Sequence, residues 1–176
     1  MENAEIGEAG ASGKRSRIYG FFAAAFASPA EDHFPSIDEI SDYRRLVEQL
    51  RLGSTESADK LVAAARNCEP QSLLVEHTRL FVGPFHLPAP LYGSVYLETS
   101  GTVMGESTLS VREYYREAGL ELSDDFNELP DHLCVELEFM QYLCAKQSTA
   151  ESESDADSSG GYRHLQTTFI EKYLSP

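Results

Sequence analysis

The stretch PDHLCVELEFMQYLCAKQ, residues 130–147, decides the fold predicted for this chain. Its apolar side chains recur at helical spacing on two neighbouring stripes, so the segment is apolar almost all round. A helix of this kind is normally surrounded by other helices, which predicts a central position in a bundle. Pro130 is a favoured first-turn residue and Asp131 complements the positive end of the helix dipole, so we expect the helix to begin at Pro130.

Helical periodicity also dominates the segments on either side, and strongly alternating strand patterns are absent. We expect further helices over about 14–27, 36–52, 55–67, 70–82, 107–118 and 162–174. Ser36 and Glu39 form a capping box at the start of the second of these, and Gly53 is a good terminator. The sequence therefore predicts an all-α protein, a two-lobed helical bundle of about seven or more helices.

The chain is expected to divide into an N-terminal helical lobe, 14–122, and a hinge with a C-terminal helical lobe, 123–176. The first lobe contains a long Pro/aromatic loop, 85–98, in which prolines interleave with aromatic side chains. The second contains the segment 149–161, which is rich in Ser, Glu, Asp and Gly. That composition buries little apolar surface and predicts a mobile acidic loop.

The formal charge is −15, from 29 acidic and 14 basic residues. Such a charge repels nucleic acid and anionic lipid, and it attracts a basic partner. Residues 1–13 lack the apolar core of a signal peptide, and the apolar run 18–27 is too short to span a bilayer. Three cysteines without a Cys-x-x-Cys pair indicate neither a disulfide framework nor a zinc knuckle. We therefore expect a cytoplasmic protein that binds no nucleic acid and does not insert stably into a membrane.

His132 and Glu136 lie four residues apart on one face of the expected central helix. This spacing suits a metal site or an acid–base pair. A metal would need further ligands, and no clustered His or Cys supplies them. We favour a protein that is not an enzyme and has no catalytic residue, metal site or cofactor. The alternative from another class is a small helical acid–base or metal-dependent enzyme centred on Asp131, His132 and Glu136.

The Pro/aromatic loop is the part of the surface best suited to hold a peptide. Prolines restrict the loop and lower the entropy cost of presenting Leu91, Tyr92 and Tyr96 as apolar anchors. Glu106 and Glu136 are candidates to surround such a groove and to pair with guanidinium groups. The other interpretation of the loop is plain packing between helices.

Four short blocks stand out in the middle of the chain. They are Leu80-Phe81-x-Gly83-Pro84, Pro88-Ala89-Pro90-x-Tyr92-Gly93-Ser94-Val95, Gly105-Glu106-Ser107-Thr108-Leu109 followed by Arg112, and Glu128-x-x-Asp131-His132. In order and spacing they resemble the TorD/DmsD family of cytoplasmic chaperones for molybdenum-cofactor redox enzymes. The resemblance implies an all-helical chaperone that binds the twin-arginine signal peptide, or leader, and the apo-form of a molybdopterin oxidoreductase catalytic subunit. It also implies that the chaperone assists cofactor insertion and delays export.

The resemblance carries peptide binding onto particular positions of this chain. These are Leu80, Phe81, Pro90, Leu91, Tyr92, Ser94, Asp131 and His132, and we add Tyr96, Glu106 and Glu136 from the loop argument. The chain departs from the family in having no Trp, and Tyr92 holds the place where a Trp is common. Family members usually continue past the last block, so we expect a truncated C-terminus or a last helix completed by a partner chain, as in a homodimer. A scaffold that binds its partner protein independently of the leader is the remaining alternative.

Overall fold

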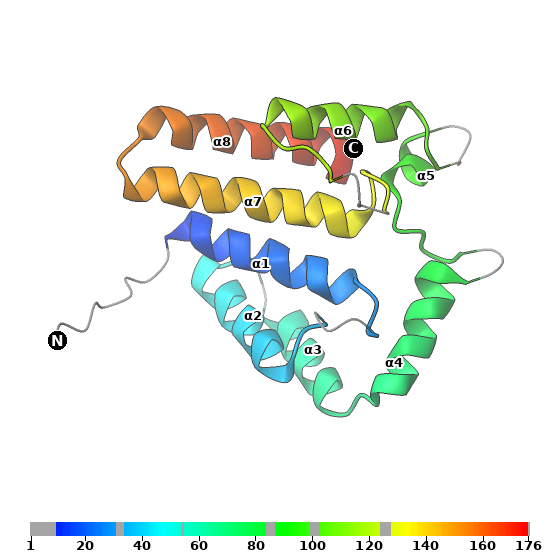
Figure 1. The fold of residues 1–176 in the computed structure, drawn as a ribbon. Coiled ribbons are helices and arrows are strands. Elements are labelled where there is room, and N and C mark those ends of the chain that lie inside the picture. The colour runs from blue at the N-terminus through cyan, green and yellow to red at the C-terminus, as the bar shows by residue number, and fades with distance from the viewer. Residues whose placement is uncertain are drawn as a thin grey trace.

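The computed structural model describes residues 10–30, 34–53, 55–83, 87–98, 103–123 and 128–175. The elements in chain order are α1 Ala11–Phe26, α2 Ile37–Leu50, α3 Glu56–Arg66, α4 Pro70–His77, η1 Thr78–Val82, α5 Gly93–Leu97, α6 Glu106–Glu117, α7 Leu133–Ser152, α8 Ala156–Phe169 and η2 Ile170–Leu174 (Figure 1). Both η1 and η2 are π-helical. The described ranges contain no strand, so the all-α prediction is confirmed. None of their helices is both long and apolar enough to cross a bilayer.

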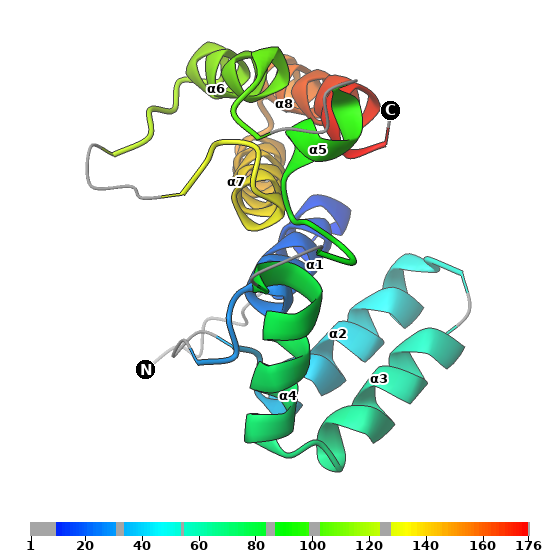
Figure 2. The same ribbon diagram turned by 90° about the vertical axis from the view of Figure 1, so that its right-hand side faces the viewer.

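Helix α7 lies at the centre of the molecule, as its all-round apolar sequence predicts. Helix α1 runs antiparallel along one side of α7, and α8 packs along the other (Figure 1). A glycine permits the close approach of α1, because a Cβ on Gly20 would lie 2.7 Å from Cδ of Gln141. Helix α1 also packs on α2, so it lies between α7 and the N-terminal helices (Figure 2).

The main core joins α6, α7, α8 and η2. Its buried members are Val111, Tyr114, Tyr115, Phe139, Met140, Leu143, Phe169 and Tyr173. The rings pack mostly edge-on or tilted, as for Phe139 and Phe169 at a centroid distance of 4.8 Å. Helix α6 belongs to the lobe predicted over 14–122, yet it packs on the helices that follow. The packing therefore crosses the predicted boundary at residue 122.

A network of side-chain hydrogen bonds inside the bundle connects α1 and α8 to α7. Gln147 Oε1 accepts hydrogen bonds from Arg15 of α1 (2.9 Å) and from Gln166 of α8 (2.9 Å). Gln166 Oε1 in turn accepts the thiol hydrogen of Cys144 (3.3 Å). Gln147, Gln166 and Cys144 are buried, and buried polar groups are stable only when they are paired in this way.

The predicted mobile loop over 149–161 is wrong. Helices α7 and α8 cover most of this range and leave only the turn 153–155 between them. Glu151 accepts a hydrogen bond from the Ser12 hydroxyl of α1 (2.6 Å), and Asp155 caps α8 by accepting from a backbone N–H in its first turn (3.1 Å). The acidic side chains thus serve a helix start and a contact with α1, which composition alone does not reveal.

The structure also confirms two smaller expectations about the N-terminal half. The capping box of Ser36 and Glu39 is present at the start of α2. The helix expected over 70–82 is present as α4 followed by η1, so its last turn is π-helical. Inside the predicted loop 85–98, the segment 93–97 forms the short helix α5, because its first turn finds a capping carboxylate from outside the loop.

Candidate functional site

Backbone hydrogen bonds hold the Pro/aromatic segment against the start of α7. The N–H of Gly93 donates to the carbonyl of Asp131 (2.8 Å), and the N–H of Leu133 donates to the carbonyl of Leu91 (2.7 Å). These bonds frame an isolated antiparallel bridge between the residues at 92 and 132. They bring together two of the sequence blocks that resemble the family, although the blocks are far apart along the chain.

Asp131 strengthens this attachment from a fully buried position. Its Oδ2 accepts the backbone N–H of Ser94 (2.8 Å), which lies in the first turn of α5 and has no acceptor within the helix. The prediction that Asp131 sits in the first turn of the central helix is therefore wrong, because α7 begins at Leu133. Ser94 is buried as well, so the Asp131 side chain and the Ser94 backbone act in the site through the loop that their hydrogen bond positions.

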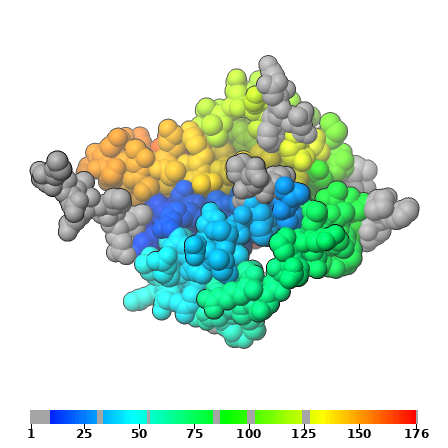
Figure 3. All heavy atoms as spheres, turned by 60° about the horizontal axis from the view of Figure 1, so that its bottom comes forward, coloured from blue at the N-terminus to red at the C-terminus, as the bar shows by residue number. Residues whose placement is uncertain are grey.

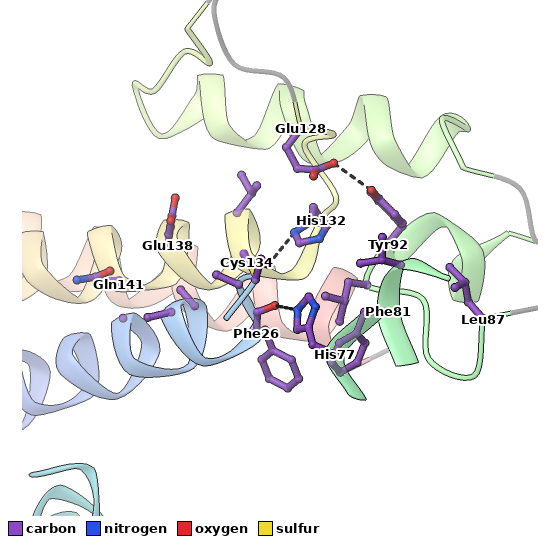
Figure 4. Close-up of a pocket in the computed structure, with 18 residues that line it drawn as sticks. Phe26, His77, Phe81, Leu87, Tyr92, Glu128, His132, Cys134, Glu138 and Gln141 are labelled. Atoms are coloured by element: carbon purple, nitrogen blue, oxygen red, sulfur yellow. Dashed lines mark hydrogen bonds between the residues drawn. The ribbon is translucent and has the colours of Figure 1, made fainter. Parts of the chain in front are cut away.

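His132 and Tyr92 form the polar edge of the site (Figure 4). His132 is the N-cap of α7, and its Nδ1 accepts the backbone N–H of Cys134 (3.3 Å). The His132 ring meets the Tyr92 ring edge to face at 5.1 Å, and the Tyr92 hydroxyl donates to Glu128 Oε1 (3.1 Å). Burial and then the charge of Glu128 raise the pKa of Tyr92, so its phenol stays neutral and able to donate.

A cavity of about 600 Å³ opens between the end of α1, η1 and the start of α7. Four predicted peptide-binding residues line it, namely Phe81, Leu91, Tyr92 and His132. Sequence reasoning missed the contribution of α1 and its C-cap, which supply Gly20, Ala23, Ala24, Phe26 and Ala27. The signal for this wall is the run of small residues that precedes Phe26, because small side chains leave room on one face of a helix.

A second cavity of about 340 Å³ lies next to the first, and part of its lining is shared with it. Its lining includes the predicted residues Phe81, Pro90, Leu91, Tyr92, Tyr96 and Glu136. The two cavities share Phe26, Phe81, Leu91 and Tyr92, and we call the pair of them the groove. The Tyr96 hydroxyl donates to the carbonyl of Pro90 (2.9 Å), which fixes the bend of the loop over the second cavity.

Besides the buried Ser94 and Asp131, two further predicted residues line neither cavity of the groove. Leu80 faces a third cavity, apolar and about 330 Å³, between α1, α3 and α4. Figure 3 shows the surface hollowed between α4 and the pair α2 and α3. Glu106 is exposed at the first position of α6 and lines neither cavity of the groove. His77, at the end of α4, is buried and pairs through Nε2 with the carbonyl of Phe26 (3.1 Å).

Glu136 gives the second cavity its chemical character. The residue is 2% exposed, and its Oε1 has no hydrogen-bond partner within the described part of the chain. Burial, and then the charge of Asp131, raise the pKa of Glu136 to about 8, so the carboxyl is largely protonated at neutral pH. The described ranges bring no three His, Cys, Asp or Glu side chains together in a way that would hold a metal ion.

Comparisons with known proteins give the chain its family. A family model described as nitrate reductase delta subunit matches residues 47–176. A perchlorate reductase assembly chaperone protein from Dechloromonas aromatica is 31% identical over 170 residues, which cover 91% of this chain and 72% of that protein. The Tat proofreading chaperone DmsD of Salmonella typhi is 36% identical over 77 residues, 44% of this chain. That match spans 38% of the DmsD length.

The fold has a counterpart among solved structures. A crystal structure from Archaeoglobus fulgidus, described as that of a redox enzyme maturation protein, aligns with a TM-score of 0.51 at 24% identity. The alignment covers 89% of this chain and 94% of the other, and it shows the shared fold. Because the family model matches most of the chain and a relative is 31% identical across 91% of it, this chain belongs to the nitrate reductase delta subunit family, which is the TorD/DmsD family of redox-enzyme chaperones.

Proposed function

We propose that this chain is a cytoplasmic chaperone for a molybdopterin oxidoreductase. In this proposal it binds the twin-arginine leader and the apo-form of the catalytic subunit, assists cofactor insertion and delays export. Its relatives are named as Tat proofreading, TorD and perchlorate reductase assembly chaperones. The observation that carries the proposal is the groove, in which Tyr92 and His132 of two separate sequence blocks meet beside an apolar wall.

The groove has the properties that a leader requires. A leader combines two guanidinium groups with an apolar stretch, so its binding site needs aromatic or aliphatic anchors beside carboxylates. Phe26, Phe81 and Leu91 supply the apolar wall, and Glu128 and Glu138 line the rim of the larger cavity. The net charge of −15 adds long-range attraction for a basic peptide and speeds encounter.

The enzyme alternative is less well supported by the same residues. The Asp131 carboxylate is fully buried and is engaged by the backbone of Ser94, while His132 uses Nδ1 to cap α7. A catalytic acid or base must instead reach a substrate atom directly. Glu136 combines a raised pKa with access to a cavity, which suits a binding site equally well.

Leader binding is tested by titrating the protein calorimetrically with a synthetic peptide that contains Arg-Arg and the following apolar stretch. Wild type should bind, and Tyr92→Ala should weaken binding about 30-fold, or about 2 kcal/mol, because it removes an anchor shared by both cavities. Leu109→Ala is the control, since Leu109 is an apolar residue 54% exposed on α6 and outside the groove. A folded Tyr92→Ala variant that binds as tightly as wild type would remove the groove from the proposal.

The scaffold alternative needs a separate experiment. Pull-down of the apo catalytic subunit is compared with and without its leader. A leader-binding chaperone loses most of the interaction when the leader is deleted. Undiminished capture of the leaderless subunit would favour the scaffold.

A further inference from the structure

Among the described residues that line the second cavity of the groove, Glu136 carries the only carboxyl group, and the other side chains are aliphatic or aromatic. Glu136 lies in the first turn of α7 and is 2% exposed, and it lines this cavity. A Cβ built on Gly93 would lie 3.5 Å from Glu136 Oε1. Because Gly93 also lines the cavity and carries no side chain, the unpaired oxygen lies beside a gap in the wall.

Within the described part of the chain, no Lys or Arg side chain faces this carboxyl from the cavity side. None of the described residues that line the cavity is Lys or Arg. Among the described residues, the titratable side chains that line the cavity or lie beside Glu136 include Tyr92, Tyr96, Tyr115, Asp131, His132 and Tyr173. Asp131 adds a second buried carboxylate whose Oδ1 also lacks a partner. The Glu136 carboxyl stays largely protonated while it is unpaired, so an occupant that binds its ionised form must bring a positive charge and hydrogen-bond donors.

We propose that the second cavity is a guanidinium-binding site, in which Glu136 accepts an arginine side chain of the bound leader. The assignment rests on the proposed function and deepens it by naming the residue that binds the arginine side chain. The walls favour arginine over lysine. Phe26, Phe81 and Tyr92 offer aromatic surface, on which a planar, weakly hydrated guanidinium stacks better than a compact ammonium. A guanidinium also offers paired donors to a carboxylate.

The pairing has a proton balance that can be measured. Burial and the charge of Asp131 hold the pKa of Glu136 at about 8, so in the free protein at pH 7 about 0.9 of the carboxyl groups carry a proton. The ion pair needs the ionised form. Binding therefore releases about 0.9 proton to the buffer at pH 7 and about 0.1 at pH 9. As the pH increases toward 7, leader affinity should rise roughly tenfold for each pH unit, and it should level off above pH 8.

Calorimetric titration with the Arg-Arg leader peptide tests the assignment. Measurements in buffers of different ionisation enthalpy give the number of protons released. For wild type we expect about 0.9 at pH 7, and for Glu136→Gln close to none. The affinity lost in Glu136→Gln should grow with pH, from little at pH 6 to at least tenfold at pH 9, because Gln resembles the protonated acid. Glu153→Gln makes the same change on an exposed side chain beyond the other end of α7, and it should behave as wild type.

A second variant guards against a failure of Glu136→Gln to fold. In Gly93→Ala the new methyl meets Glu136 Oε1 at 3.5 Å and atoms of Asp131 at 3.7 and 3.8 Å, which are ordinary contacts. The fold should survive while the methyl covers the carboxyl, so leader affinity and proton release should both fall. A leader with Lys-Lys in place of Arg-Arg should bind wild type at least tenfold more weakly.

The possible results separate this assignment from the proposed function. Leader binding with no proton release, or with the same release in folded Glu136→Gln, overturns the guanidinium site and leaves leader binding intact. Equal affinity for the Lys-Lys leader also overturns the assignment to arginine. Failure of wild type to bind any leader at either pH overturns the proposed function and this inference together.

Discussion

Replacing Glu136 by Gln isolates the stability effect of one buried carboxyl. Burial and then Asp131 raise the pKa of Glu136 from 4.5 to about 8 in the folded protein. In the unfolded chain the carboxyl ionises at its ordinary pKa. Between the two values the folded state keeps a proton that the unfolded state has lost. The stabilising contribution is therefore fully present below pH 4.5 and is lost as the pH rises through that interval to about 8.

The size of the effect follows from the shift. Each pH unit in the interval removes about 1.4 kcal/mol from the free energy of unfolding. From pH 5 to pH 9 the loss reaches about 4 kcal/mol, a large part of the ~5–15 kcal/mol that stabilises a typical domain. Gln cannot ionise, so Glu136→Gln escapes this loss. Relative to wild type, the variant should gain about 4 kcal/mol between pH 5 and pH 9.

Urea unfolding followed by far-UV circular dichroism at each unit from pH 5 to pH 9 measures this difference. Subtracting the two curves removes every titrating group that the proteins share. Glu153→Gln, with the same chemical change at an exposed position, should run parallel to wild type. If Glu136→Gln also runs parallel to wild type, Glu136 ionises near its ordinary pKa and the argument from burial fails.

Three further variants test other parts of the structure. Asp131→Ala should lower the free energy of unfolding by about 1–3 kcal/mol, because the Ser94 N–H loses its acceptor. Asp131→Asn keeps an oxygen and should recover most of this stability, so equal losses in the two variants would contradict the role of the hydrogen bond. His77→Ala should speed amide hydrogen exchange in α4 more than elsewhere, since the bond to the Phe26 carbonyl is lost, and uniform exchange would contradict it. Replacing 149–161 by a short Gly/Ser link should lower the melting temperature by more than about 10 °C, because two helix ends are removed; a drop of a few degrees would contradict the helical assignment.

Helix positions could be predicted from this sequence because apolar periodicity is a local signal. The central helix is the clearest case, since its packing on both sides follows from its two apolar stripes. The prediction of a mobile loop over 149–161 was wrong because the signal that makes this segment helical is not local. Its composition is polar, and what makes it helical is capping by Asp155 and the contact of Glu151 with α1, both of which depend on where the chain returns in space.

The site could be predicted only in part. The resemblance named Tyr92 and His132, but no spacing indicates that their backbones pair, because the pairing depends on a long-range bridge. Spacing also singled out Glu136, although its burial depends on the close approach of Gly93. Phe26 was expected only as an apolar member of the first helix. Its place between the two cavities depends on how α1 crosses α7.

The pairing of α1 with α7 has a consequence for synthesis of the protein on the ribosome. The apolar face of α1 is made early, but its main partner helix begins more than 100 residues later. At ~5–20 residues per second, α1 waits several seconds or more for its partner to be translated. The nascent chain therefore exposes most of the apolar run 18–26 for that time, because of the helices made in between only α2 packs on α1 among the major contacts of the described residues.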